Sequence, residues 1–113
     1  METDEWVNEV RLVGKVSGSV DEHELPSGDF VAALRLVVPR QPGEIRGTAT
    51  VDTIDVACWS GRTRQSARRL AAGDQVEVVG ALRRRFFRAG AATASRYEVE
   101  ASRLTRVRRA LQP

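Results

Sequence analysis

Most of this chain alternates apolar and polar side chains with a period of two, and only one segment has the composition of a helix. Val10, Leu12 and Val16 begin the pattern, which returns over residues 30–38 and 51–59. A period of two is typical of half-buried strands, because successive side chains of a strand point to opposite faces. The pattern predicts a small all-β domain.

Two further strands and one helix complete the predicted order. Residues 75–87 form the fourth strand, bent at Gly80, and residues 96–101 form the fifth. The helix spans residues 62–72, between the third and fourth strands, and is rich in strong helix formers. Five strands with one helix in that place are the order of the OB-fold, a five-stranded Greek-key barrel. Glycines inside long strands are typical of barrel strands that bend sharply.

Turns and loops separate these elements and suggest the domain limits. Residues 25–29 are predicted as a turn, and residues 39–50 and 88–95 as loops, because glycine, proline and small residues gather there. A chain of 113 residues is one domain in length. We expect an acidic extension over residues 1–7, the OB-fold domain over 8–104 and a short, frayed basic tail over 105–113.

Charge is distributed unevenly along the chain. Residues 1–29 carry eight acids against Arg11 and Lys15, a net charge of −6, whereas residues 60–113 carry 13 arginines against four acids, a net charge of +9. A pI near 10 with the positive charge in one half indicates a nucleic-acid surface. Codon usage in a GC-rich genome would also enrich arginine, so the charge needs support from other residues.

The aromatic residues give that support, because sequence-tolerant binding of a single strand needs rings for the bases and positive charge for the phosphates. Alternation places Trp59 on the face opposite the core residues Val56 and Cys58. It places Phe87 on one face with two arginines of the run from Arg83 to Arg88. We interpret Phe30 and Tyr97 as core and Phe86 as core or rim, and Trp6 precedes the first strand. The predicted nucleic-acid contacts are Trp59, Phe87, Arg40, Arg46, Arg62, Arg83, Arg84, Arg85, Arg88 and Arg96.

Nothing in the sequence favours catalysis. His23 lies among acids in a predicted turn region, and Cys58 has core-facing parity with no histidine beside it. One cysteine and one histidine do not make a zinc site, so we expect no metal, cofactor or enzymatic activity. The chain has no apolar run long enough to span a membrane and no signal peptide, which predicts a cytoplasmic protein.

Several segments resemble the bacterial single-stranded DNA-binding protein (SSB) family, most of all its short actinobacterial members. Residues 8–16 (NEVRLVGKV) resemble the family's first strand, and residues 25–28 (LPSG) resemble the turn before its second. Residues 55–59 (DVACW), 70–82 (LAAGDQVEVVGAL) and 96–101 (RYEVEA) are similar to its third, fourth and closing strands. The resemblance runs from about residue 8 to residue 107.

The resemblance implies an OB-fold that binds single-stranded DNA in replication, repair and recombination, through stacked aromatics and a basic groove. It also implies a homo-oligomer, a dimer or tetramer in which first strands pair, here through Val10, Leu12 and Val13. Two of the family's stacking positions align with Pro42 and Thr53, which have no ring to offer. The sequence ends without the family's acidic tip, so recruitment of replication enzymes through such a tail is not expected.

Two hypotheses of different classes remain open. The first is sequence-tolerant binding of single-stranded DNA, with RNA as a possible ligand, because stacking and phosphate contacts do not distinguish the sugars. The second is an OB-fold module that works through oligomerisation or a protein partner, with weak or lost nucleic-acid binding. Trp59 and Phe87 favour the first, while Pro42 and Thr53 favour the second.

Overall fold

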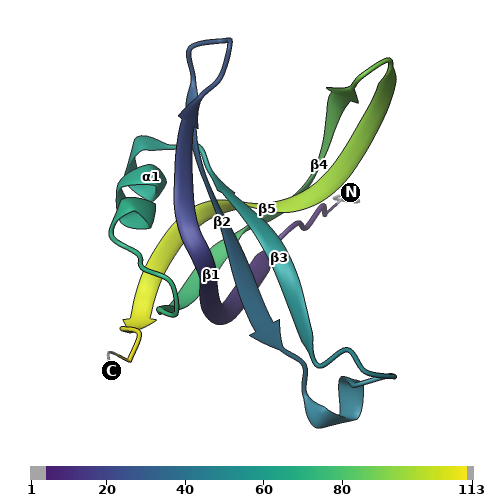
Figure 1. Cartoon of the computed structure of the whole chain (residues 1–113), viewed down its shortest axis with the longest axis vertical. Coiled ribbons are helices and arrows are strands. Elements are labelled where there is room, and N and C mark those ends of the chain that lie inside the picture. Colours follow the sequence, from purple (N-terminus) through teal and green to yellow (C-terminus); the bar gives the residue numbers. More distant parts are fainter. Residues whose placement is uncertain (1–4, 112–113) are drawn as a thin grey trace, which may run out of the picture.

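The computed structural model describes residues 5–111. These residues form five strands, one α-helix and one 3₁₀ turn (Figure 1). Their bounds are β1 (Val10–Glu24), β2 (Phe30–Pro39), η1 (Pro42–Glu44), β3 (Val51–Cys58), α1 (Gly61–Arg68), β4 (Gln75–Ala89) and β5 (Ala92–Arg108).

The strands close into a barrel in the order β1-β2-β3-β5-β4. All neighbouring pairs are antiparallel except β3 and β5, which are parallel. β1 closes the barrel because its first part pairs with β4 and its later part pairs with β2. With α1 between β3 and β4, this is the predicted OB-fold. Within residues 5–111, no helix has the length and apolar character to cross a bilayer.

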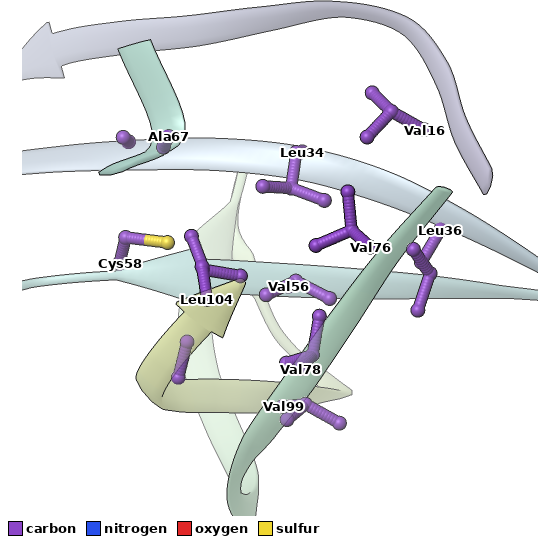
Figure 2. Packing of buried hydrophobic residues seen from close by; sticks show 12 residues of the cluster. Val16, Leu34, Leu36, Val56, Cys58, Ala67, Val76, Val78, Val99 and Leu104 are labelled. Atoms are coloured by element: carbon purple, nitrogen blue, oxygen red, sulfur yellow. The ribbon is translucent and has the colours of Figure 1, made fainter. Parts of the chain in front are cut away.

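The core consists of the inward side chains of all five strands (Figure 2). Leu36, Val76 and Val78 are fully buried, and Cys58 lies with them as predicted. α1 adds Ala67 to this core and covers one end of the barrel. The helix begins after Ser60, whose side chain accepts a hydrogen bond from the Thr63 amide at 3.1 Å.

The elements differ in length from the prediction. α1 ends at Arg68, before the predicted limit at residue 72, because the amides of Arg69 and Leu70 bond three residues back and tighten the last turn. The predicted loop over residues 88–95 is instead the end of the β4–β5 hairpin. Gly90, with φ of 66°, occupies the first position of a two-residue turn.

Pairing with neighbouring strands explains why β1 and β5 exceed their predicted lengths. β1 continues to Glu24 because its later residues pair with β2, so His23 lies in a strand and not in a turn. β5 continues to Arg108 because it pairs with the first residues of β4. Residues 105–108, predicted as part of a frayed tail, therefore belong to the barrel.

Candidate nucleic-acid interface

Two hairpins, β1–β2 and β4–β5, project from the same side of the barrel (Figure 1). Arg83, Arg85 and Phe87 lie on one face of β4 because they are two residues apart. Arg83 is directly opposite Glu98 of β5, and Arg85 is opposite Arg96. Directly opposed residues of an antiparallel pair project to the same side. We call this side of the hairpin the arginine face.

Trp59 follows β3 and extends this face. Its neighbours Val56 and Cys58 are buried in the core, whereas the Trp59 side chain is only half-buried. The guanidinium carbon of Arg85 lies 4.8 Å from the centre of the Trp59 ring. This distance is within the range of a cation–π contact. Arg85 therefore covers part of the Trp59 ring.

Two carboxylates hold Arg85 in this position. Its Nε donates to Glu98 at 2.8 Å, and its Nη2 donates to Glu100 at 3.0 Å. Arg83 reaches the other oxygen of Glu100 at 3.4 Å. The side chain of Glu98 is only 7% exposed, whereas that of Glu100 is 34% exposed. The two arginines are thus partly neutralised, and Glu98 depends on Arg85 more than Glu100 does.

Sequence reasoning missed these carboxylates, although the signal was present. Glu98 and Glu100 alternate with the buried residues Val99 and Ala101, so both acids point away from the core. An antiparallel hairpin then brings them level with the arginines of β4. Predicting these ion pairs requires the register of β4 against β5, which the sequence pattern alone does not supply.

The same face carries a second aromatic–arginine pair nearer the hairpin end. The guanidinium carbon of Arg96 lies 5.8 Å from the centre of the Phe87 ring, which remains 45% exposed. Arg88 is exposed close to the turn. Arg96 and Glu98 also reach toward β2 and β3, where they line an open hollow of about 270 Å³ whose other charged residues are Asp21, Arg35 and Asp55.

The opposite face of the hairpin corrects the predicted core. Leu82, Phe86 and Tyr97 share the side of the buried strand residues, yet they are 47%, 66% and 60% exposed. The side of the strand was predicted correctly. However, the β4–β5 hairpin extends beyond the barrel, where no other strand covers this side of the hairpin. Arg84 lies 4.9 Å from the Phe86 ring and 5.6 Å from the Tyr97 ring, so it belongs to this opposite face.

Three predicted arginines lie apart from the arginine face. Arg40, at the β2–β3 end, pairs with Asp52 at 2.7 Å, and this hydrogen bond lowers the pKa of the Asp52 carboxyl. Arg46 is exposed in the β2–β3 loop, which lies away from the β4–β5 hairpin in Figure 1. Arg62 is exposed in the first turn of α1.

The predicted oligomer residues occupy the first part of β1. Val10, Leu12 and Val13 are all half-buried. Val10 and Leu12 pack against the core, and they line an open hollow of about 360 Å³ with Leu82 and Tyr97. Within residues 5–111, β2 pairs with β1 only from Lys15 onward, which leaves residues 10–14 with one unpaired edge.

Cys58 has no features of a reactive thiol. Its side chain is fully buried, and burial raises the pKa of the thiol to about 12, with a hydrogen bond to Thr63 acting in the opposite direction. The thiol therefore stays protonated near neutral pH and packs as a small apolar group, as the alternation of β3 predicted.

Comparisons with known proteins agree with this geometry. Residues 7–107 match the model of the "Single-strand binding protein family". The fold is similar to that of a Plasmodium falciparum SSB in complex with ssDNA, with a TM-score of 0.68, 20% identity and coverage of 88% of this chain and 90% of that one. No curated protein sequence matches the chain.

Two bacterial structures are also similar. A deletion mutant of the single-stranded DNA binding protein from Thermus aquaticus has a TM-score of 0.68 and 26% identity, over 95% of this chain and 44% of that one. A small single-stranded DNA-binding protein from Streptomyces coelicolor has a TM-score of 0.63 and 20% identity, over 87% of this chain and 92% of that one.

Proposed function

Because the chain belongs to the single-strand binding protein family, we propose that it holds single-stranded DNA on the arginine face of the β4–β5 hairpin. The observation that carries this proposal is the packing of Arg85 over Trp59, with Phe87 and Arg96 further along the same face. Rings and guanidinium planes stack with bases of any sequence, and guanidinium groups also pair with phosphates. No catalytic step is part of this proposal.

DNA must compete with the carboxylates that already hold these arginines. Removing Arg85 from the nearly buried Glu98 would leave an unpaired carboxylate, which is costly. The contact with Glu100 is partly exposed, and exposed ion pairs contribute only about 0–1 kcal/mol each. Stacking contributes about 1–3 kcal/mol per base. We therefore expect Arg85 to keep Glu98 while a phosphate replaces Glu100.

Titration with oligo(dT), monitored by tryptophan fluorescence and anisotropy, tests this arrangement. Arg85→Ala removes a stacking and phosphate-binding group, so we expect affinity to fall about tenfold or more. Glu100→Gln leaves the competing side chain neutral, so affinity should rise about two- to fivefold, the range of a weak ion pair.

Arg103→Ala is the matched control, because Arg103 is an arginine of the same sheet paired with an acid, Glu77, on the barrel body. Its affinity should stay within about twofold of wild type. Added salt should weaken wild-type binding, since phosphate contacts release counterions. Absence of any signal from the wild-type protein at low salt would overturn the proposed function.

A contact between copies of the chain has its own support and does not exclude DNA binding. The unpaired edge of β1 and the hollow beside Leu82 and Tyr97 together offer an apolar surface. An unpaired strand edge is a template for pairing with another strand. The proposal includes a homo-oligomer that works in the cytoplasm, with RNA as a competitor to be tested against DNA.

A further inference from the structure

A further hollow lies beside Trp59, outside the arginine face. It is open to solvent, has a volume of about 390 Å³ and is lined by Gly28, Asp29, Phe30, Trp59 and Arg64. Phe30 stands at the start of β2 and is 44% exposed, although its position in the alternation suggested a core residue. An exposed ring beside a second aromatic side chain indicates a surface for a flat ligand.

A guanidinium group lies near the exposed ring of this hollow. The guanidinium carbon of Arg64 lies 5.6 Å from the centre of the Phe30 ring. Within residues 5–111, neither the Arg64 Nε–H nor the Trp59 Nε1–H has a hydrogen-bond partner, although both atoms are buried. Unsatisfied buried donors are rare in folded proteins and call for an explanation. Both belong to side chains that line the hollow, but neither atom is itself accessible from it.

The residues present favour a base over a phosphate. Phe30 and Trp59 offer apolar ring surface, and Asp29 adds a negative charge that disfavours a phosphate in the hollow. Arg64 is already near a second carboxylate, Glu22, at 3.5 Å. A nucleobase suits these surroundings, because its flat faces stack on aromatic rings.

We infer that this hollow, which we call the Phe30 subsite, binds a nucleobase of the single strand that crosses the arginine face. The inference rests on the proposed function, and Trp59 connects the two surfaces because it contacts Arg85 and also lines the hollow. The subsite supplies a stacking ring in a chain that has Pro42 and Thr53 where rings were expected. DNA would then run from the β4–β5 hairpin past Trp59 toward α1.

Phe30→Leu tests the subsite, because leucine keeps an apolar side chain and removes the ring. Binding of a long oligo(dT) should weaken about fivefold or more, which is the lower end of one lost base stack. The melting temperature should change little, since Phe30 is largely outside the core. Phe30→Trp keeps an aromatic ring at this position, so its affinity should match that of the wild type.

Phe86→Leu is the matched control, since Phe86 is an exposed phenylalanine on the opposite face of the β4–β5 hairpin. Its affinity should stay within about twofold of wild type. Equal weakening by both leucine variants would show that the loss is not specific to the hollow and would overturn the inference.

A fluorescence reporter gives a second, independent readout. Phe30→Trp combined with Trp6→Phe and Trp59→Phe leaves one tryptophan, located in the subsite. Its fluorescence should be quenched as oligo(dT) saturates the protein, because stacking with a base quenches indole emission. Binding seen by anisotropy without a change at this tryptophan would contradict the subsite and leave the proposed function standing. Failure of the wild-type protein to bind oligo(dT) would contradict both the Phe30 subsite and the proposed function.

Discussion

At the scale of single residues, the partners of each arginine matter more than the number of arginines. Residues 60–113 carry a net charge of +9, which suggests a strongly positive surface. In the folded chain, Arg83 and Arg85 share carboxylates with β5, and Arg40 is paired with Asp52. On the proposed arginine-face site, DNA would therefore exchange one set of ion pairs for another. The balance of that exchange depends on Glu100, a residue that a count of positive charges ignores.

Asp74 gives a prediction about acid stability. Its buried carboxylate accepts hydrogen bonds from the amides of Ala71 at 2.9 Å and Ala110 at 2.8 Å, and these bonds lower its pKa below the ordinary 3.8. A lowered folded-state pKa stabilises the fold above the ordinary pKa, and that contribution is lost as the pH falls through the folded value. Asp74→Asn should therefore lower the melting temperature near pH 7 and flatten its decline below about pH 5.

Melting curves between neutral pH and pH 3 make this measurement. Asp21→Asn serves as the control, because Asp21 is an exposed acid on β1. Its curve should follow that of the wild type. A parallel decline for wild type and Asp74→Asn would mean that Asp74 does not contribute to acid stability.

At the scale of elements, two glycines inside the strands, Gly80 and Gly14, mark close approaches of the backbone. A Cβ on Gly80 would lie 2.0 Å from the carbonyl oxygen of Glu100, and one on Gly14 would lie 2.5 Å from that of Val37. The sequence pattern predicted a bend at Gly80, and β4 and β5 shift register between Val79 and Gly80. The shift lies at the base of the hairpin that carries the arginine face, so fold and site depend on the same position.

Gly80→Ala tests this dependence. The added methyl group forces the backbone of β5 to move at Glu100, so we expect a loss of about 1–3 kcal/mol in unfolding free energy. Gly43→Ala, in open space within η1, should change stability by less than about 0.5 kcal/mol. Urea unfolding compares the two. An alanine at position 80 with wild-type stability would show that β5 accommodates the methyl group without strain.

At the scale of the whole molecule, an apolar region around the first part of β1 stays uncovered within residues 5–111. Val13 is half-buried beside the unpaired edge of β1 and lies opposite Glu77 of β4. We expect the wild-type chain to self-associate. Val13→Lys should reduce the molar mass of the assembly in solution, because burying an ammonium group at an interface is costly. The lysine should leave the barrel intact, since it gains Glu77 as a neighbour.

Light scattering during size-exclusion chromatography measures this mass. Val107→Lys is the control, because Val107 is an exposed valine of β5. It should elute as the wild type does. A wild-type protein that remains monomeric at every concentration would contradict self-association through β1.

The sequence by itself determined the OB-fold and the buried face of each strand around the core. Alternation with a period of two indicates which side of a strand is buried, and it placed Val56 and Cys58 correctly in the core. Such a pattern is local, so the buried side of a strand can be inferred from residues that are close in the sequence. The order of five strands and one helix then left few ways to close a barrel.

Only the tertiary structure decided where each strand ends and which charges meet. Phe86 and Tyr97 have core parity, but they lie on a hairpin that extends beyond the barrel and stay exposed. The contacts of Arg85 with Glu98 and Trp59 join three strands or their ends, and no short segment of sequence contains all three residues. Register and closure set these contacts, because they depend on residues that are far apart in the chain and adjacent only after folding.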